Sequence, residues 1–175
     1  MKKYVLTGGP GVGKTTVLKL LSSNGHVIVE AATAVIREEL KKKGKAVPWI
    51  DFPLFQKKVL ELQLKLEAAV PKGAKMVFLD RGIPDGMAYF LARGQKPPKD
   101  LMEKAAKAMY CKVFMLEPLP EFEETEVRRD VELASRIHAE VGKVYRKLGY
   151  RLIRVPAMAA EERAGLILGE ICRNS

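Results

Sequence analysis

Residues 8–15 read Gly8-Gly9-Pro10-Gly11-Val12-Gly13-Lys14-Thr15 and satisfy the pattern G-x-x-x-x-G-K-[ST]. A short apolar run at residues 4–7 precedes the stretch, and a segment with helical periodicity at residues 14–22 follows it. In this context the glycines let backbone N–H groups turn inward around phosphate oxygens, and the helix N-terminus adds a positive partial charge. We therefore predict a phosphate-binding loop for a nucleoside triphosphate.

The pattern assigns separate tasks to the residues at the end of this loop. Lys14 is expected to reach the β- and γ-phosphates, and the Thr15 hydroxyl is expected to ligate Mg²⁺. The expected nucleotide is ATP, with GTP as the alternative. The predicted nucleotide-binding residues are Gly8, Gly9, Pro10, Gly11, Val12, Gly13, Lys14, Thr15 and Thr16.

Apolar strand-like runs and helical segments alternate along the rest of the chain. The predicted strands are 4–7, 26–29, 75–79, 112–116 and 151–155, and the predicted helices are 14–22, 33–43, 52–70, 85–93, 100–110, 129–148 and 160–172. Nearly continuous apolar strands, each followed by a helix, are typical of a parallel sheet covered on both faces. We predict a three-layer α/β/α fold of the P-loop class with a five-stranded parallel sheet.

One segment does not fit the alternation. Residues 117–128 are rich in Pro and Glu and lie between the fourth predicted strand and a long helix. We interpret residues 117–136 as a mobile helical lid. At 175 residues the chain is too short for two ordinary domains, so we expect one domain over residues 1–175.

The composition narrows the partners and the location. A net charge of +10 favours anionic ligands, but the basic residues are scattered without interleaved aromatics, which disfavours nucleic-acid binding. No apolar run is long enough for a signal peptide or a membrane span, so we expect a cytoplasmic protein without a membrane partner. Cys111 and Cys172 lie in apolar surroundings and are expected to be buried thiols, with no disulfide or zinc site.

An acid and a base stand together where the third predicted strand ends. Asp80 and Arg81 follow the run MVFL, and a Gly-Ile-Pro-Asp turn comes next. The pair is either a solvated ion pair at the surface or a part of the phosphate site. Parallel strands bring their carboxyl ends to one common edge where ligands bind, which favours the second interpretation.

With these features in place, the chain resembles the small P-loop kinase-like proteins, an AAA-type family of small ATPases and kinases. That group includes the nicotinamide riboside kinase domain of bacterial NAD-metabolism regulators. More distantly, the chain is similar to deoxynucleoside and thymidylate kinases. The resemblance rests on four stretches in order, of which only the first is specific alone: GGPGVGKTT, VIVEAATAVIREEL, FLDRGIPDGMAYF and VRRDVELASRIHAEVGKVYRKLGYRLIRVP.

The resemblance implies roles for three residues near the strand ends. Glu30 matches the acid after the second strand that serves as a candidate base for the acceptor hydroxyl. Its alternative is a helix N-terminal acid favoured by the dipole. Asp80 matches an acid near Mg²⁺ or the acceptor, and Arg81 matches an arginine near phosphate.

The resemblance also places arginines in the lid, where Arg128, Arg129 and Arg136 are the candidates. Arginine can contact phosphate through two N–H groups and neutralise charge on the transferred group. We expect Arg128 or Arg129 to touch phosphate. The alternative is a surface ion-pair ladder, since Arg129, Glu132 and Arg136 lie three and four residues apart.

Acceptor recognition is assigned to the region AVPWIDFPLFQ. Its aromatic residues Trp49, Phe52 and Phe55 suit an aromatic base, and in deoxynucleoside kinases a Gln in the corresponding helix reads the base, here Gln56. The alternative is that these aromatics are core or staple residues. Asp85 and Tyr89 are either acceptor-site groups or, respectively, a helix N-terminal acid and a core aromatic. We expect neither His26 nor His138 to be catalytic.

Two classes of function agree with these features. The first is an ATP- and Mg²⁺-dependent kinase that phosphorylates a small, nucleoside-like metabolite. The second is a nucleotide-binding switch or slow NTPase that acts through a protein partner. A closed acceptor pocket would favour the first and a flattened, exposed surface the second. The sequence leaves open the acceptor, the choice between ATP and GTP, and the oligomeric state.

Overall fold

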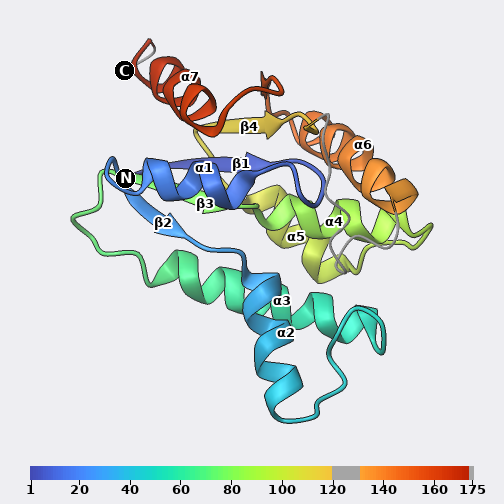
Figure 1. Cartoon of the computed structure of the whole chain (residues 1–175). Coiled ribbons are helices and arrows are strands. Elements are labelled where there is room, and N and C mark those ends of the chain that lie inside the picture. The colour runs from blue at the N-terminus through green and yellow to red at the C-terminus, as the bar shows by residue number, and fades with distance from the viewer. Residues whose placement is uncertain (120–130, 174–175) are drawn as a thin grey trace.

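The computed structural model describes residues 1–119 and 131–173, and its centre is one parallel sheet (Figure 1). The strand order is β2-β3-β1-β4-β5. The fold prediction of an α/β protein with five parallel strands is therefore confirmed. The strands are β1 Lys2–Thr7, β2 His26–Ile28, β3 Met76–Asp80, β4 Lys112–Leu116 and β5 Leu152–Val155. The helices are α1 Lys14–Leu21, α2 Ala31–Lys41, α3 Phe52–Ala68, α4 Ile83–Ala92, α5 Lys99–Lys107, α6 Val131–Lys147 and α7 Ala160–Cys172.

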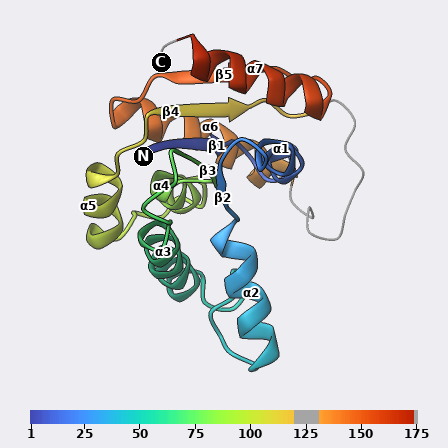
Figure 2. The same ribbon diagram turned by 90° about the vertical axis from the view of Figure 1, so that its left-hand side faces the viewer.

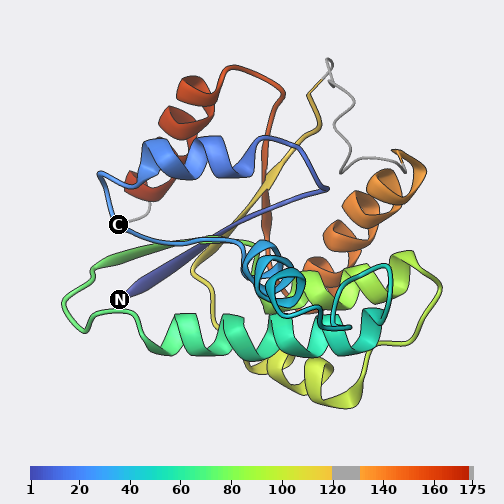
Figure 3. The same cartoon turned by 60° about the horizontal axis from the view of Figure 1, so that its bottom comes forward.

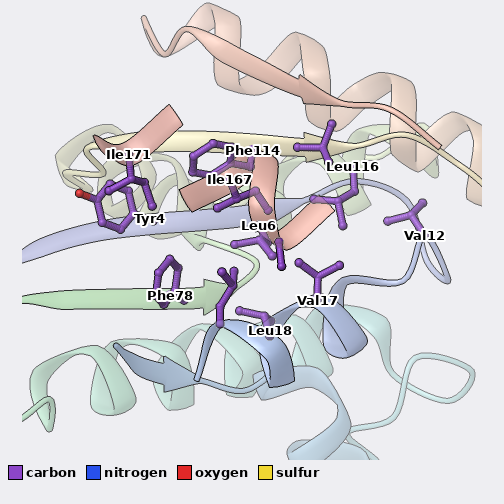
Figure 4. Close-up of a cluster of buried hydrophobic side chains, with 13 residues drawn as sticks. Tyr4, Leu6, Val12, Val17, Leu18, Phe78, Phe114, Leu116, Ile167 and Ile171 are labelled. Carbon is purple, nitrogen blue, oxygen red and sulfur yellow. The ribbon is translucent and has the colours of Figure 1, made fainter. Parts of the chain in front are cut away.

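The central strands are buried on both faces because helices cover both. Leu6, Phe78 and Phe114 point to one face and pack with apolar side chains of α1 and α7 (Figure 4). Val5 and Val77 point to the other face and pack against α4 and α6. Figure 3 shows α1 and α7, in blue and red, side by side on one side of the strands. The central strands β1, β3 and β4 therefore contain nearly continuous apolar runs.

Helices α2 and α3 pack together beyond the sheet (Figure 2). With α4 and α5 they form a third apolar cluster that includes Val35, Phe52, Phe55 and Leu101. Asp51 caps α3 by accepting a hydrogen bond from the backbone N–H of Leu54 at 3.0 Å. This cluster builds an apolar wall next to the carboxyl end of the sheet.

The strand register brings three loops to one edge. Leu6 of β1 lies beside Asp80 of β3, and Ile28 of β2 lies beside Leu79. The carboxyl ends of β1, β2 and β3 therefore lie side by side. They are followed by the phosphate-binding loop, Glu30 and Arg81, respectively. This common edge is the one that the sequence predicted for the ligand.

The expectation of buried thiols is wrong, since Cys111 and Cys172 are both exposed. Their apolar neighbours in sequence belong to the ends of elements: Cys111 precedes β4, and Cys172 is the last residue of α7. At such ends the chain reaches the surface even when the adjoining residues are buried. Within residues 1–119 and 131–173, no helix is long and apolar enough to cross a membrane.

Candidate functional site

A pocket of about 510 Å³ lies at the carboxyl edge of the sheet and is lined by the phosphate-binding loop, α2, α3, α4 and α6. It brings together most of the sequence-predicted site residues, although they come from distant parts of the chain. Those that line it are Pro10, Gly11, Gly13, Lys14, Thr15, Thr16, Glu30, Gln56, Asp80, Arg81, Asp85 and Tyr89.

The other candidates lie elsewhere. Gly8, Gly9 and Val12 belong to the loop but are not among the described residues that line the pocket. Val12 packs in the core, and the Gly9 N–H donates to His138 of α6. Arg136 is exposed on α6, outside the lining formed by the described residues. Arg128 and Arg129 lie outside the described residues, as does most of the proposed lid.

The loop has the backbone conformation that its glycines predict. Gly8, Gly11 and Gly13 have φ angles of +131°, +73° and +86°, which L side chains rarely adopt. A Cβ atom at Gly8 would also lie 2.7 Å from the carbonyl oxygen of Leu116. Val12 is buried and packs in the core below the loop (Figure 4). The glycines therefore permit a loop conformation that other residues would adopt only with strain.

Lys14 opens α1 and is 5% exposed. Its ammonium donates a hydrogen bond to the carbonyl oxygen of Gly9 at 2.9 Å, within the same loop. Burial, together with the nearby Arg81 guanidinium, lowers the pKa of Lys14 to about 8. A buried cation that lines a pocket is suited to an anionic ligand.

Thr15 and Asp80 form a second polar group in the pocket. The Thr15 hydroxyl donates to Asp80 Oδ2 at 3.0 Å, and Asp80 is only 2% exposed. Within the part of the chain that the structure describes, Asp80 Oδ1 has no hydrogen-bond partner. Burial raises the pKa of Asp80, and this shift is opposed by Lys14 and Arg81. A hydroxyl and an unsatisfied carboxylate oxygen are the hard oxygen donors that Mg²⁺ prefers, so these residues fit that ion.

Arg81 connects the segment after β2 with the phosphate-binding loop after β1. Its Nε donates to Glu30 Oε1 at 2.7 Å, and its NH1 donates to the carbonyl oxygen of Gly8 at 2.8 Å. The guanidinium also lies over the Tyr89 ring, 5.3 Å from its centre. Arg81 has a φ of +74°, which is rare for a residue other than glycine and is typical of functional sites.

Glu30 is held as a carboxylate by this contact. Burial alone would raise its pKa, but the Arg81 charge and hydrogen bonds from Arg81 and Thr33 lower the pKa of Glu30 to about 2. Its second oxygen accepts from the Thr33 hydroxyl at 2.8 Å. Glu30 is also the N-cap residue of α2, although its side chain forms no capping hydrogen bond.

Asp85 is bonded within the protein. Its carboxylate accepts hydrogen bonds from the Thr7 hydroxyl at 2.5 Å, the Tyr145 hydroxyl at 2.7 Å and the backbone N–H of Gly82 at 2.9 Å. The Gly82 contact is that of a helix N-terminal acid in the first turn of α4. The geometry therefore favours the structural interpretation of Asp85: it fixes the turn that carries Arg81.

We predict that Gly82→Ala destabilises the protein by about 1–3 kcal/mol, because an added Cβ would overpack this turn. That atom would lie 2.6 Å from the Tyr145 hydroxyl and 2.9 Å from the Tyr110 ring. Urea unfolding measures the change. Gly73→Ala is the control, since nothing lies within 4 Å of a Cβ there. Equal stability of the two variants would contradict tight packing at Gly82.

The side of the pocket formed by α3 and α4 is mostly apolar. Phe55, Gln56 and Tyr89 line it, and Gln56 is 7% exposed. Phe52 lines the pocket too, but its ring also packs against the Phe90 ring, with 4.9 Å between the ring centres, as a core residue does. Trp49 is 64% exposed and is not among the described residues that line the pocket. The prediction that it forms part of an aromatic wall is therefore wrong. Trp49 precedes the N-cap of α3, where the chain has turned outward.

Three residues that support the loop, His138, Glu117 and Arg163, were not predicted from the sequence to contact it. His138 Nδ1 accepts a hydrogen bond from the backbone N–H of Gly9 at 3.1 Å, and its Nε2 lies 3.3 Å from Glu117 Oε2. Arg163, 1% exposed, donates to the carbonyl oxygen of Val12 at 2.6 Å. The only sequence feature that could have indicated the contact is the spacing of four residues between Ala134, which lines the pocket, and His138, because this spacing puts both on one face of α6.

Comparisons of the sequence and the fold with known proteins agree with a phosphate-binding loop protein. A family model described as an AAA domain matches residues 3–163. No curated protein matches the sequence significantly.

Among solved structures, the chain is similar to deoxyadenosine kinase from M. mycoides, with a TM-score of 0.69, 14% identity, and 98% of this chain and 99% of that chain covered. It is similar to thymidylate kinase from Ehrlichia chaffeensis, with a TM-score of 0.71, 14% identity, and coverage of 97% and 98%. A third similar structure is thymidylate kinase from Candida albicans, with a TM-score of 0.60, 16% identity, and coverage of 99% and 92%. At these identities the likeness shows the fold.

Proposed function

The chain belongs to the AAA domain family of P-loop proteins, and on that premise we propose that it is a Mg²⁺-dependent kinase that transfers the γ-phosphoryl group of ATP to a small, nucleoside-like metabolite. One observation carries the proposal: a single pocket contains both the loop residues Lys14 and Thr15 and an apolar half with Phe55 and Tyr89. A switch that acts on a partner protein has no need of such an apolar second half beside the loop. The pocket therefore favours the kinase over the switch.

The nucleotide half is assigned to the loop. The backbone N–H groups near Gly11 and Gly13 face the phosphates, and the Lys14 ammonium exchanges its contact with Gly9 for phosphate oxygens. The Thr15 hydroxyl and Asp80 would hold Mg²⁺, whose charge would offset the negative charge of the phosphates. Deoxyadenosine kinase of M. mycoides, a protein of similar fold, has been solved with bound dATP, which supports nucleotide binding by this chain.

The acceptor half is assigned to Glu30, Arg81 and Gln56. Glu30 receives the hydrogen bond of the acceptor hydroxyl, and its low pKa keeps it ionised at neutral pH. A weak base is sufficient here because phosphoryl transfer depends mainly on positioning and charge. When Arg81 turns from Glu30 toward a phosphate, Glu30 loses its nearest cation and becomes more basic. Gln56, buried and beside Gly86, presents an amide to a planar base.

A transfer screen tests the proposal. The purified protein is incubated with γ-labelled ATP or GTP and one acceptor at a time: nucleosides, nicotinamide riboside, nucleoside monophosphates and related vitamins. We expect label on one acceptor class, and a rate that depends on Mg²⁺. Reactions without acceptor measure hydrolysis. Labelled inorganic phosphate as the sole product with every acceptor would contradict the kinase and favour the switch or slow NTPase.

A further inference from the structure

Helix α6 supports the phosphate-binding loop from behind. The backbone N–H of Gly9 donates to His138 Nδ1 at 3.1 Å. A Cβ atom at Gly9 would lie 3.1 Å from the carbonyl oxygen of Ala134 and 3.3 Å from His138 Cβ. The glycine therefore allows the loop to approach α6 closely enough for this hydrogen bond.

The bond requires a defined form of the histidine. Nδ1 accepts a proton only when it carries none, so the imidazole is neutral with its hydrogen on Nε2. That Nε2 faces Glu117 Oε2 at 3.3 Å, and a carboxylate can only accept. Both neighbours thus specify the same tautomer. Protonation of His138 would turn Nδ1 into a donor that faces another donor, the Gly9 N–H.

Glu117 is itself held in place from two sides. Its Oε1 accepts from Arg154 at 2.7 Å, and its backbone carbonyl accepts from Arg163 NH2 at 2.9 Å. Arg163 also donates to the carbonyl oxygens of Val12 and Pro156, at 2.6 Å and 2.9 Å. The residue that orients His138 is therefore fixed to the same loop through Arg163.

The neighbouring charges act on His138 in opposite directions. Burial lowers its pKa, Glu117 after β4 raises it, and Arg154 of β5 and Lys14 of α1 lower it. The neutral form is therefore the main form at neutral pH. Lys14 donates a hydrogen bond to the carbonyl oxygen of Gly9. The Gly9 backbone is therefore hydrogen-bonded at its N–H to His138 of α6 and at its carbonyl to Lys14 of α1.

We propose that His138 is a positioning residue for the nucleotide: the neutral imidazole, oriented by Glu117, holds the Gly9 peptide so that the loop is preorganised for phosphate. This inference rests on the proposed nucleotide binding. Acid weakens nucleotide binding because the imidazolium cannot accept the Gly9 hydrogen bond. His138 does not contact the phosphates, and its role is exerted through the loop.

Binding of a fluorescent ATP analogue tests the proposal in wild type, His138→Asn and His138→Phe from about pH 8 to about pH 5.5. The Asn side-chain oxygen can replace Nδ1 as an acceptor without titrating, whereas Phe keeps the volume and removes the acceptor. After subtraction of the His138→Asn profile, which carries the ionisation of the nucleotide itself, we expect wild-type affinity to begin to fall below about pH 6.5. The loss should approach roughly tenfold as His138 becomes fully protonated. His138→Phe should bind roughly tenfold more weakly at about pH 8.

A second variant probes the orienting carboxylate. Glu117→Gln removes the charge that favours the imidazolium, so the acid loss should move to lower pH. A merely structural contact would not move this midpoint. In nucleotide-free protein, the Gly9 amide NMR signal should shift with the same midpoint in wild type and stay constant in His138→Asn.

The outcomes separate the two proposals. A wild-type protein that binds the analogue, with His138→Phe binding equally well or His138→Asn showing the same acid loss, overturns the positioning role alone. A wild-type protein that binds no nucleotide at about pH 8 overturns the proposed function and the positioning role with it, while the Gly9 signal still reports whether the contact exists. Thermal unfolding of each variant shows that all are compared in the folded state.

Discussion

Replacement of Lys14 by alanine is expected to weaken nucleotide binding by at least about a hundredfold and to abolish transfer. The ammonium is 5% exposed, lines the pocket and has a carbonyl oxygen, Gly9 O, as its hydrogen-bond partner. That partner is neutral, so the buried charge is available to phosphate oxygens. Removing it leaves the loop with N–H dipoles alone to offset the charge of a triphosphate.

The measurement is titration with a fluorescent ATP analogue at fixed ionic strength. Lys19→Ala is the matched control, since Lys19 is an exposed lysine of the same helix and removes the same net charge. Lys14→Met keeps most of the side-chain volume, so that lost binding is assigned to the charge. If Lys14→Ala and Lys14→Met bind as tightly as Lys19→Ala, the loop is not the phosphate site.

The sheet and its loop could be predicted from sequence because each rests on local patterns. Buried parallel strands must be apolar on both faces, so runs such as MVFL and KVFML identify themselves. The loop needs glycine where φ is positive, at Gly8, Gly11 and Gly13, and the sequence supplies it. The strand ends then placed Asp80 and Arg81 at the ligand edge, as the register with Leu6 confirms.

Contacts between distant segments could not be predicted in the same way. His138 and Gly9 are 129 residues apart, and no period or motif connects them. The sequence left Asp85 open between an acceptor-site group and a helix N-terminal acid, and only the three donors from separate elements that occupy its oxygens favour the second. The sequence predicts Trp49 in an aromatic wall, yet its side chain is exposed, because the direction of a side chain before a helix cap depends on how the chain turns there. Such details follow from packing, which the local pattern does not encode.

Glu30→Gln is expected to lower the transfer rate by about 10²–10⁴-fold while nucleotide affinity stays within about threefold of wild type. Glutamine keeps an oxygen that can accept from Arg81, and its amide N–H can donate to the Thr33 hydroxyl, so the loop geometry is retained. It removes the negative charge that, in the proposed reaction, orients the acceptor hydroxyl and receives its proton. Arg81 keeps its bond to the Gly8 carbonyl and its approach to Asp85 at 3.5 Å, which limits its displacement.

Asp80→Asn is the comparison that separates the two acids. Asp80 accepts from the Thr15 hydroxyl, whereas Glu30 pairs with Arg81 on the acceptor side. We therefore expect Asp80→Asn to raise the Mg²⁺ concentration needed for half-maximal transfer, and Glu30→Gln to leave that concentration unchanged. Steady-state rates at a series of Mg²⁺ concentrations measure both. Wild-type transfer by Glu30→Gln would remove Glu30 from the reaction, and a changed Mg²⁺ requirement in Glu30→Gln alone would exchange the two roles. Since the two carboxylates approach the pocket from different strands, these variants divide the site into its metal half and its acceptor half.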